Sequence, residues 1–285
     1  RVAAGGMGIA TAGVLQSATA TSLLTVSFAG RGLIAVGAGL AVMLGADVGT
    51  ALMTVVFSLD LSWLSPLLIF VGVVMFLPRQ DTTVGRVGRV LIGLGLIILA
   101  LQLIVLATRP LTAAPEVRAL LAALPREFLL EIVVGAALTV AAYSSLASVL
   151  LTATLAAQDV LPLTVALGRV LGANVGGGVL AMVATSGAPV EQRRLPLGNL
   201  LFKLTGALLA IPLVPLAVAE LPRHIDTVLH QVVGFHLGFN VLLALTFIGL
   251  TQPMAKLVER LLPSRAQDSS TLRPRHLDRV ALVTP

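Results

Sequence analysis

Length, composition and charge exclude most functional classes for this chain. Of its 285 residues, 57% are hydrophobic and only 11% are charged, whereas a soluble domain carries about a quarter charged residues. The chain has no cysteine, which excludes disulfides and thiolate metal sites. Its formal charge of +6 is scattered over loops and a tail, and one Trp and one Tyr offer little surface for stacking on bases. We therefore predict an integral membrane protein that binds no nucleic acid.

In chain order, the sequence predicts two interrupted apolar segments and six membrane spans. Residues 2–29 and 128–156 are apolar at their ends and polar at their middles. The other apolar runs approach the length of about 20 helical residues that a bilayer core of about 30 Å requires. These spans are expected at residues 32–57, 62–78, 87–107, 160–185, 196–219 and 226–250. The predicted fold class is an all-α polytopic membrane protein.

The two halves of the chain are related in sequence. With a shift of 127 residues, positions 16–21 fall on 143–148 and positions 44–49 fall on 171–176, without a gap. Residues 17–49 share 12 identities in 33 with their counterparts, where so biased a composition gives about three or four by chance. We predict two repeats whose interrupted segments form re-entrant hairpins.

Positive charge predicts the orientation of these repeats in the membrane. If the basic tail is cytoplasmic, the arginine-containing loops 78–89 and 187–194 also lie inside, while loops 108–127 and 220–226 lie outside. The first hairpin then opens inward and the second outward, which is an inverted-topology repeat. The chain is thereby divided into a first transport repeat (1–107), an extracytoplasmic connector (108–127), a second transport repeat (128–250) and a basic cytoplasmic tail (251–285).

The polar break of the first hairpin is a candidate binding element. Gln16-Ser-Ala-Thr-Ala-Thr21 places an amide and hydroxyls inside an apolar stretch, where irregular backbone persists only if it is buried in protein or lines a cavity. At the start of a half-helix, such residues present amides to an oxyanion or carbonyls to an alkali cation. The alternative is that the hydroxyls bond back to their own helix or join helices. Duplication of the pattern favours a functional role.

Two glycine-rich segments place a polar residue inside an apolar helix: Gly45-Ala-Asp-Val-Gly-Thr50 and Gly172-Ala-Asn-Val-Gly-Gly-Gly178. The glycine spacing is typical of close helix packing, but packing does not explain Asp47 or Asn174. We therefore expect a local unwinding at which the backbone approaches an ion, with Asp47 as the main intramembrane carboxylate. A buried ion pair without a transport role is the alternative.

Two basic residues could balance Asp47 or attract an anionic substrate, namely Arg169 and Lys203. Either could instead extend to a membrane face, and for Lys203, close to the predicted cytoplasmic end of its span, we expect this arrangement. His236 and Asn240 are spaced i, i+4 on one helical face, where they could line a cavity or pack in the core.

Together these segments resemble the bacterial sodium/phosphate cotransporter family, the type II sodium-dependent phosphate symporters. That family carries two Gln-Ser-Ser-Ser-Ala-Thr signatures, each followed by Gly-Ala-Asn-Ile-Gly-Thr, and both pairs of motifs above are similar to them. This chain departs at Ala18, Thr19, Tyr143, Leu146, Asp47 and Gly177. The departures bear on phosphate specificity and sodium stoichiometry, and Asp47 could strengthen a cation site or bind a proton in place of one sodium. The tail is similar to the linker that leads to a PhoU-like domain, so we expect that domain, and a first helix, to be missing.

The resemblance implies a secondary active transporter of the bacterial inner membrane, not an enzyme, which takes up phosphate or a related oxyanion with sodium by alternating access. Sodium is the coupling ion and no other cofactor is expected; the partners are phosphate, sodium and the lipid bilayer, and homodimerisation is left open. The alternatives are a membrane regulator that senses phosphate status without net transport and an uncoupled ion pathway. The expected substrate and ion contacts are Gln16, Ser17, Thr19, Thr21, Asp47, Thr50, Ser144, Ser145, Arg169 and Asn174. Of these, Gln16, Asp47 and Asn174 are expected to bind sodium.

Overall fold

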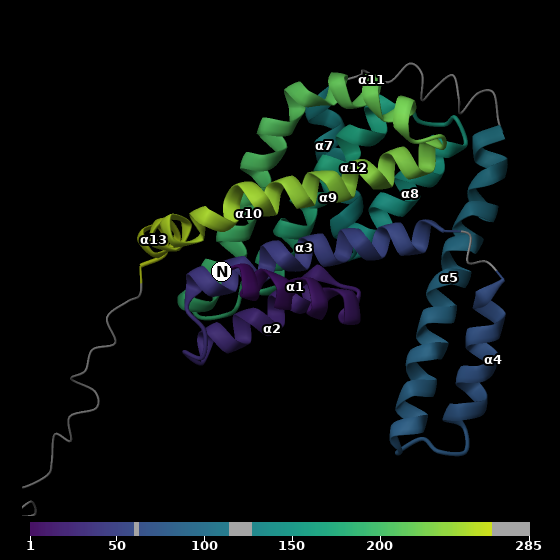
Figure 1. Ribbon diagram of the computed structural model, residues 1–285, viewed down its shortest axis with the longest axis horizontal. Coiled ribbons are helices and arrows are strands. Elements are labelled where there is room, and N and C mark those ends of the chain that lie inside the picture. The colour runs from purple at the N-terminus through teal and green to yellow at the C-terminus, as the bar shows by residue number, and fades with distance from the viewer. Residues whose placement is uncertain (60–62, 114–126, 264–285) are drawn as a thin grey trace, which may run out of the picture.

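The protein is helical throughout the part of the chain that the computed structural model describes, residues 1–59, 63–113 and 127–263 (Figure 1). The first half contains α1 (Val2–Leu15), α2 (Ala18–Gly30), α3 (Val36–Ser58), α4 (Leu64–Phe76) and α5 (Thr83–Ala113). The second half contains α7 (Phe128–Ala142), α8 (Ser145–Ala157), α9 (Leu163–Ala184), α10 (Val190–Ala210), α11 (Val214–His224), α12 (Val228–Phe247) and α13 (Thr251–Leu261). Single 3-10 turns, Ile211–Leu213 and Ile248–Leu250, join α10 to α11 and α12 to α13.

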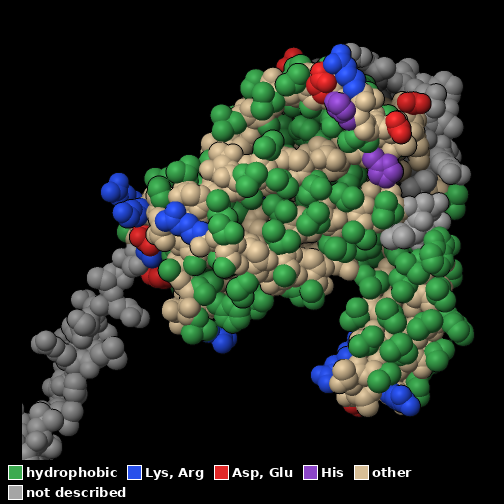
Figure 2. Space-filling model, in the orientation of Figure 1, with side chains coloured by type: hydrophobic (Ala, Val, Ile, Leu, Met, Phe, Trp, Pro, Cys, Tyr) green, Lys and Arg blue, Asp and Glu red, His purple; other side chains and the backbone are tan. Residues whose placement is uncertain are grey.

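Five helical segments among the described residues are long and apolar enough to cross a membrane. They are Val36–Ser58, Thr83–Ala100, Leu163–Ala184, Val190–His224 and Val228–Leu261. These segments overlap five of the six expected spans, and α4, with 13 residues, lies within the remaining one, 62–78. Figure 2 shows hydrophobic side chains covering the flank of the molecule, with the charged side chains gathered at its ends. This distribution is that of a membrane protein.

The repeat found in the sequence is also a repeat of local structure. α2 begins at Ala18 and α8 at Ser145, again 127 residues apart, and each follows a helix of 14 or 15 residues. The breaks before them have nearly the same backbone, with Gln16 at φ 54° and ψ 24° and Tyr143 at φ 55° and ψ 22°. At about 1.5 Å per residue, none of these four helices reaches across about 30 Å of hydrocarbon.

Glycines hold the first helix of each repeat against the third. A Cβ atom added to Gly45 of α3 would overlap the carbonyl group of Gly5 on α1, and one added to Gly172 of α9 would overlap that of Ile132 on α7. Both α3 and α9 are continuous helices through these glycines. The expected local unwinding at Asp47 and Asn174 is therefore wrong, because the glycines are used to bring two helix backbones into contact.

The two repeats interlock in a reciprocal way. α2 of the first repeat packs on α9 of the second, and the equivalent pair, α3 and α8, also pack together. α12 of the second repeat contacts α3 of the first repeat as well as α8 and α9 of its own. The hairpin of α4 and α5 projects to one side of this bundle (Figure 1). The polar residues discussed next lie where α3, α8, α9, α10 and α12 meet.

Candidate transport site

Each repeat contains a helix N-terminus capped by a serine. The hydroxyl of Ser17 accepts a hydrogen bond from the backbone N–H of Ala20 at 3.1 Å, and the hydroxyl of Ser144 accepts one from Ala147 at 3.1 Å. Both serines have extended backbone, and the residue before each of them, Gln16 or Tyr143, is in the left-handed region. The left-handed conformation costs a residue other than glycine about 1–2 kcal/mol. The conformation is thus held at both positions by the surrounding structure, and it leaves amide groups of α2 and α8 directed out of the helix.

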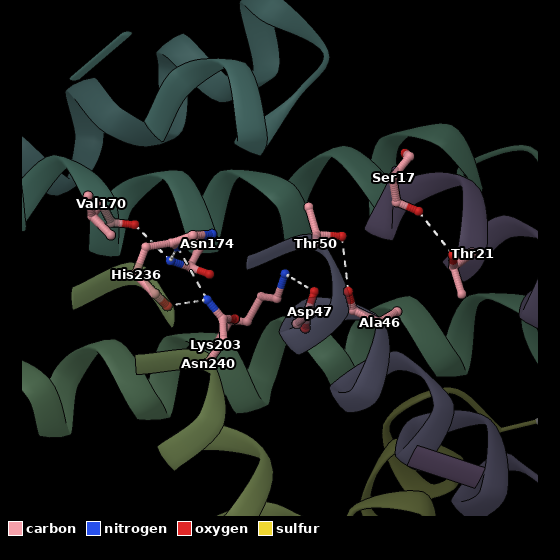
Figure 3. Close-up of polar contacts among 10 residues, drawn as sticks. All are labelled: Ser17, Thr21, Ala46, Asp47, Thr50, Val170, Asn174, Lys203, His236 and Asn240. Atoms are coloured by element: carbon pink, nitrogen blue, oxygen red, sulfur yellow. Dashed lines mark hydrogen bonds and ion pairs between the residues drawn. The ribbon is translucent and has the colours of Figure 1, made fainter. Parts of the chain in front are cut away.

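A buried ion pair joins the two repeats. Lys203 of α10 places its Nζ atom 2.8 Å from Oδ1 of Asp47 on α3, and both side chains are 4% exposed (Figure 3). Lys203 does not extend to a membrane face as expected, because its side chain is buried and directed to the carboxylate of Asp47. The second carboxylate oxygen, Oδ2 of Asp47, is buried and has no hydrogen-bond partner among the described residues.

The ammonium group of Lys203 and the first turn of α8 both lie near Gly177 of α9. A Cβ atom added to Gly177 of α9 would be 3.5 Å from Nζ of Lys203 and 3.8 Å from the hydroxyl of Ser145. Gly177 is therefore the point where the lysine and the serine-capped helix come close together. Thr50 occupies the equivalent position in the first repeat, and a side chain at 177 would contact the ammonium.

Next to this pair lies a neutral cluster of two amides and an imidazole (Figure 3). The Nδ2 atom of Asn174 is 3.1 Å from Nδ1 of His236 and donates to the carbonyl of Val170 at 2.9 Å. Asn240 places its Nδ2 atom 3.3 Å from the same Nδ1 and donates to the carbonyl of His236 at 2.8 Å. Because amide N–H groups only donate, Nδ1 is the acceptor and the ring proton of the neutral imidazole is on Nε2.

Several polar atoms of this region have hydrogen-bonding capacity left over. Nε2 of His236 and the carbonyl oxygens of Asn199 and Asn240 are buried without a partner in the described part of the chain. An unpaired buried polar group costs about 1–3 kcal/mol, so such atoms are usually explained by a role, a water or a ligand. One N–H donor and two carbonyl acceptors are suited to an oxyanion and a cation, respectively.

Arg169 lies in a different ion pair. Its Nε atom is 2.7 Å from Oε2 of Glu131, which links α9 to α7, and the two side chains are 10% and 6% exposed. Arg169 therefore balances Glu131, and Lys203 balances Asp47. Sequence reasoning missed Glu131, although an acidic residue inside the apolar run 128–142 was the available signal.

Comparison with known proteins identifies the family. The model of the family described as "Na+/Pi-cotransporter" matches residues 1–105 and 110–251 of the chain. The chain belongs to this family. The resemblance seen in the duplicated motifs is thereby confirmed, and the family is one of transporters.

The chain is similar to curated proteins of several bacteria. It is 45% identical over 278 residues to "Putative inorganic phosphate export protein YjbB" of Escherichia coli K12, and 45% identical over 283 residues to the protein of that name in Salmonella typhimurium LT2. The alignment covers 98% of this chain and 51% of each of these relatives, so the chain spans about half their length. "Uncharacterized protein YqeW" of Bacillus subtilis is 23% identical over 253 residues, covering 89% of this chain and 82% of YqeW. No solved structure matches the chain.

Within this family member, the structure brings together only part of the residues expected to form the site. Figure 3 shows Asp47, Thr50 and Asn174 around Lys203, with Ser17 and Thr21 to one side. The hydroxyl of Thr21 donates to the carbonyl of Ser17, which is the back-bonding considered as the alternative for the first break. The hydroxyl of Thr50 likewise donates within its helix, to the carbonyl of Ala46. Gln16 and Thr19 are partly exposed at the first break, and Tyr143 is exposed at the second.

We predict that Glu131→Gln destabilises the protein by about 2–3 kcal/mol, because it leaves the Arg169 guanidinium in a largely buried position without its counter-charge. Thermal unfolding in detergent measures the loss. Glu127→Gln is the matched control, since the same change is made four residues earlier at an exposed position and should be nearly neutral. Equal unfolding temperatures for the two variants would show that the Glu131–Arg169 pair contributes no stability.

Proposed function

We propose that this chain forms the transport core of a carrier that moves inorganic phosphate or a related oxyanion across the membrane by alternating access. The observation that carries the proposal is the pair of serine-capped helix N-termini, found at equivalent positions of the two repeats. The N-terminus of a helix favours an anion through its free N–H groups and its dipole. Membership of the sodium/phosphate cotransporter family supports phosphate as the first substrate to test.

The arrangement of the repeats supports alternating access. The contacts of α2 with α9 and of α3 with α8 are reciprocal, as they are around a pseudo-twofold axis. The helix pairs α1–α2 and α7–α8 are too short to cross the bilayer individually, so each pair enters and leaves on one side as a re-entrant hairpin. Inverted hairpins that meet near the midplane are a common basis of alternating access in secondary transporters.

One end of the bundle is proposed to face the cytoplasm. Arg194, in the loop region predicted to lie inside, donates from its guanidinium to the carbonyl of Leu262 at 3.0 Å, just after α13. The loop and the start of the basic tail therefore lie at the same end, as the charge distribution requires. Residues 264–285, on which the expectation of a linker to a PhoU-like domain rests, lie outside the described residues.

In this proposal the substrate lies between the two serine turns. The substrate contacts are drawn from Gln16, Ser17, Thr19, Thr21, Ser144 and Ser145. Gln16, Thr50 and Asn174 are the proposed ligands of a coupling sodium ion, and Arg169, paired with Glu131, takes no direct part. YjbB is named for phosphate export, whereas the sequence motifs favoured sodium-coupled uptake. Transport direction in a coupled carrier follows the sum of the gradients, so the direction is a matter for measurement.

The decisive experiment is phosphate flux in proteoliposomes. Vesicles loaded with unlabelled phosphate should exchange it for external labelled phosphate, and a sodium gradient of either sign should shift the equilibrium if sodium is coupled. Exchange without a sodium effect would indicate a carrier that is not coupled to sodium. Phosphate binding without exchange would instead support a membrane regulator, and the absence of both would contradict the proposal.

The serine caps offer a direct test of the site. We predict that Ser17→Ala and Ser144→Ala each lower phosphate exchange about tenfold or more, because each removes the group that orients a substrate-facing N-terminus. Loss of a cap by itself costs about 1 kcal/mol of stability. Thr227→Ala is the matched control, since Thr227 caps α12 through a bond from the N–H of His230 and lies outside the two breaks. Equal losses of exchange in all three variants would show that the effect is structural.

A further inference from the structure

Asp47 and its equivalent in the second repeat, Asn174, differ in charge and in the groups that their side chains contact. Asn174 is a neutral amide that bonds to a carbonyl and to His236. Asp47 is a carboxylate of the same burial, and the charged group beside it is the ammonium of Lys203. A carboxylate in such a position needs a counter-cation, since burying an isolated charge is prohibitively costly. In this chain the counter-cation is covalently attached.

The cation also lies next to a small residue of the second repeat. Gly177 is the equivalent of Thr50, and a Cβ atom added to it would be 3.5 Å from Nζ of Lys203, in ordinary contact. The ion pair of Asp47 and Lys203 is therefore found where α3, α9 and α10 come together.

We propose that the Lys203 ammonium takes the place of an exchangeable sodium ion beside Asp47, so that no sodium binds or moves at this position. The proposal rests on the proposed function only in treating this region as part of the transport path. Both cations neutralise a carboxylate, but a tethered ammonium cannot leave with the substrate. One ion fewer then contributes to the driving force, and the phosphate gradient itself has more influence on the direction of transport.

The test is whether sodium binds when the tethered cation is removed. In Lys203→Met, the carboxylate of Asp47 loses its partner, and we expect sodium chloride to raise the unfolding temperature relative to choline chloride at equal ionic strength. At about ten times the dissociation constant the rise should be about 2–5 °C. Arg169→Met is the matched control, because it also leaves a buried carboxylate, Glu131, without its partner, but outside the equivalent positions 47 and 174; a response specific to Asp47 should be absent there. Lys203→Met/Asp47→Asn, which removes both charges, should not gain it either.

Two comparisons would overturn the proposal. One is a Lys203→Met protein whose sodium response is no larger than that of the double variant. The other needs no single variant and therefore survives a failure of Lys203→Met to fold: a sodium response in the wild type that disappears in the double variant would show that Asp47 binds sodium despite Lys203. Because unfolding is measured without phosphate, an absence of phosphate flux would reject the proposed function and leave this result standing.

Discussion

Gly45→Ala is expected to destabilise the protein by more than about 3 kcal/mol, although alanine is normally the better helix former. The added methyl group would overlap the backbone of Gly5, where no flexible side chain can move aside. α1 and α3 would have to separate along their contact, and α3 carries Asp47 two residues further on. Thermal unfolding in detergent and the yield of monodisperse protein measure the effect. Gly172→Ala should behave alike, because its methyl group meets the backbone of Ile132.

Gly6→Ala is the control for this prediction. Gly6 lies on the same helix as Gly5, and a Cβ atom added there meets nothing within 4 Å. The change should be neutral or raise stability by up to about 1 kcal/mol, through helix propensity alone. If Gly45→Ala proved as stable as Gly6→Ala, the close approach of α1 and α3 would be incorrect.

The helix breaks could be predicted from sequence because their signal is local. A cluster of amide and hydroxyl groups inside an apolar run is costly in a bilayer. Because a similar cluster recurs 127 residues later, a chance occurrence does not explain the pattern. The structure places a left-handed residue and a serine cap at each of these two points. The two breaks and their serine caps are therefore confirmed, and the role of Ser17 and Ser144 in binding a substrate stays a prediction.

The use of the glycines could not be predicted in the same way, because it depends on the neighbouring helix. Glycines around Asp47 allow either an unwound backbone or a close helix contact, and the local pattern does not distinguish them. The deciding feature lies forty residues earlier, where Gly5 and Gly8 of α1 offer a backbone that α3 can approach. The partners of Asp47 and Arg169 are likewise settled by tertiary packing, which brings Lys203 to one and Glu131 to the other.

The position of Lys203 shows how a tertiary contact changes a functional interpretation. With a span expected from residue 196, the lysine stands about 10 Å from the membrane face, where its side chain can reach water. In the structure the side chain is buried and its ammonium lies 2.8 Å from the carboxylate of Asp47. That carboxylate belongs to another helix, so the sequence around Lys203 could not predict this contact.

Breaking this pair is expected to have the second large effect. In sodium-free buffer, Lys203→Met and Asp47→Asn should each destabilise the protein by about 3–5 kcal/mol, because each leaves one buried charge without its partner. Lys203→Met/Asp47→Asn should recover most of that loss, since a neutral side chain at 47 reproduces what Asn174 already does in the second repeat. Unfolding measurements on the four proteins form a double-mutant cycle, and the coupling energy is expected to exceed about 2 kcal/mol.

Phosphate exchange by the same four proteins then separates stability from transport. If the pair only holds α3 to α10, exchange should return together with stability in the double variant. If the ammonium has a role at the site itself, the double variant should fold well and still exchange phosphate at least about tenfold more slowly than the wild type. We expect the second result, because Gly177 has the ammonium and the start of α8 as neighbours, so the ion pair with Asp47 lies near the second serine-capped helix. A coupling energy near zero would contradict both accounts, since two side chains buried at 2.8 Å from each other would then contribute independently.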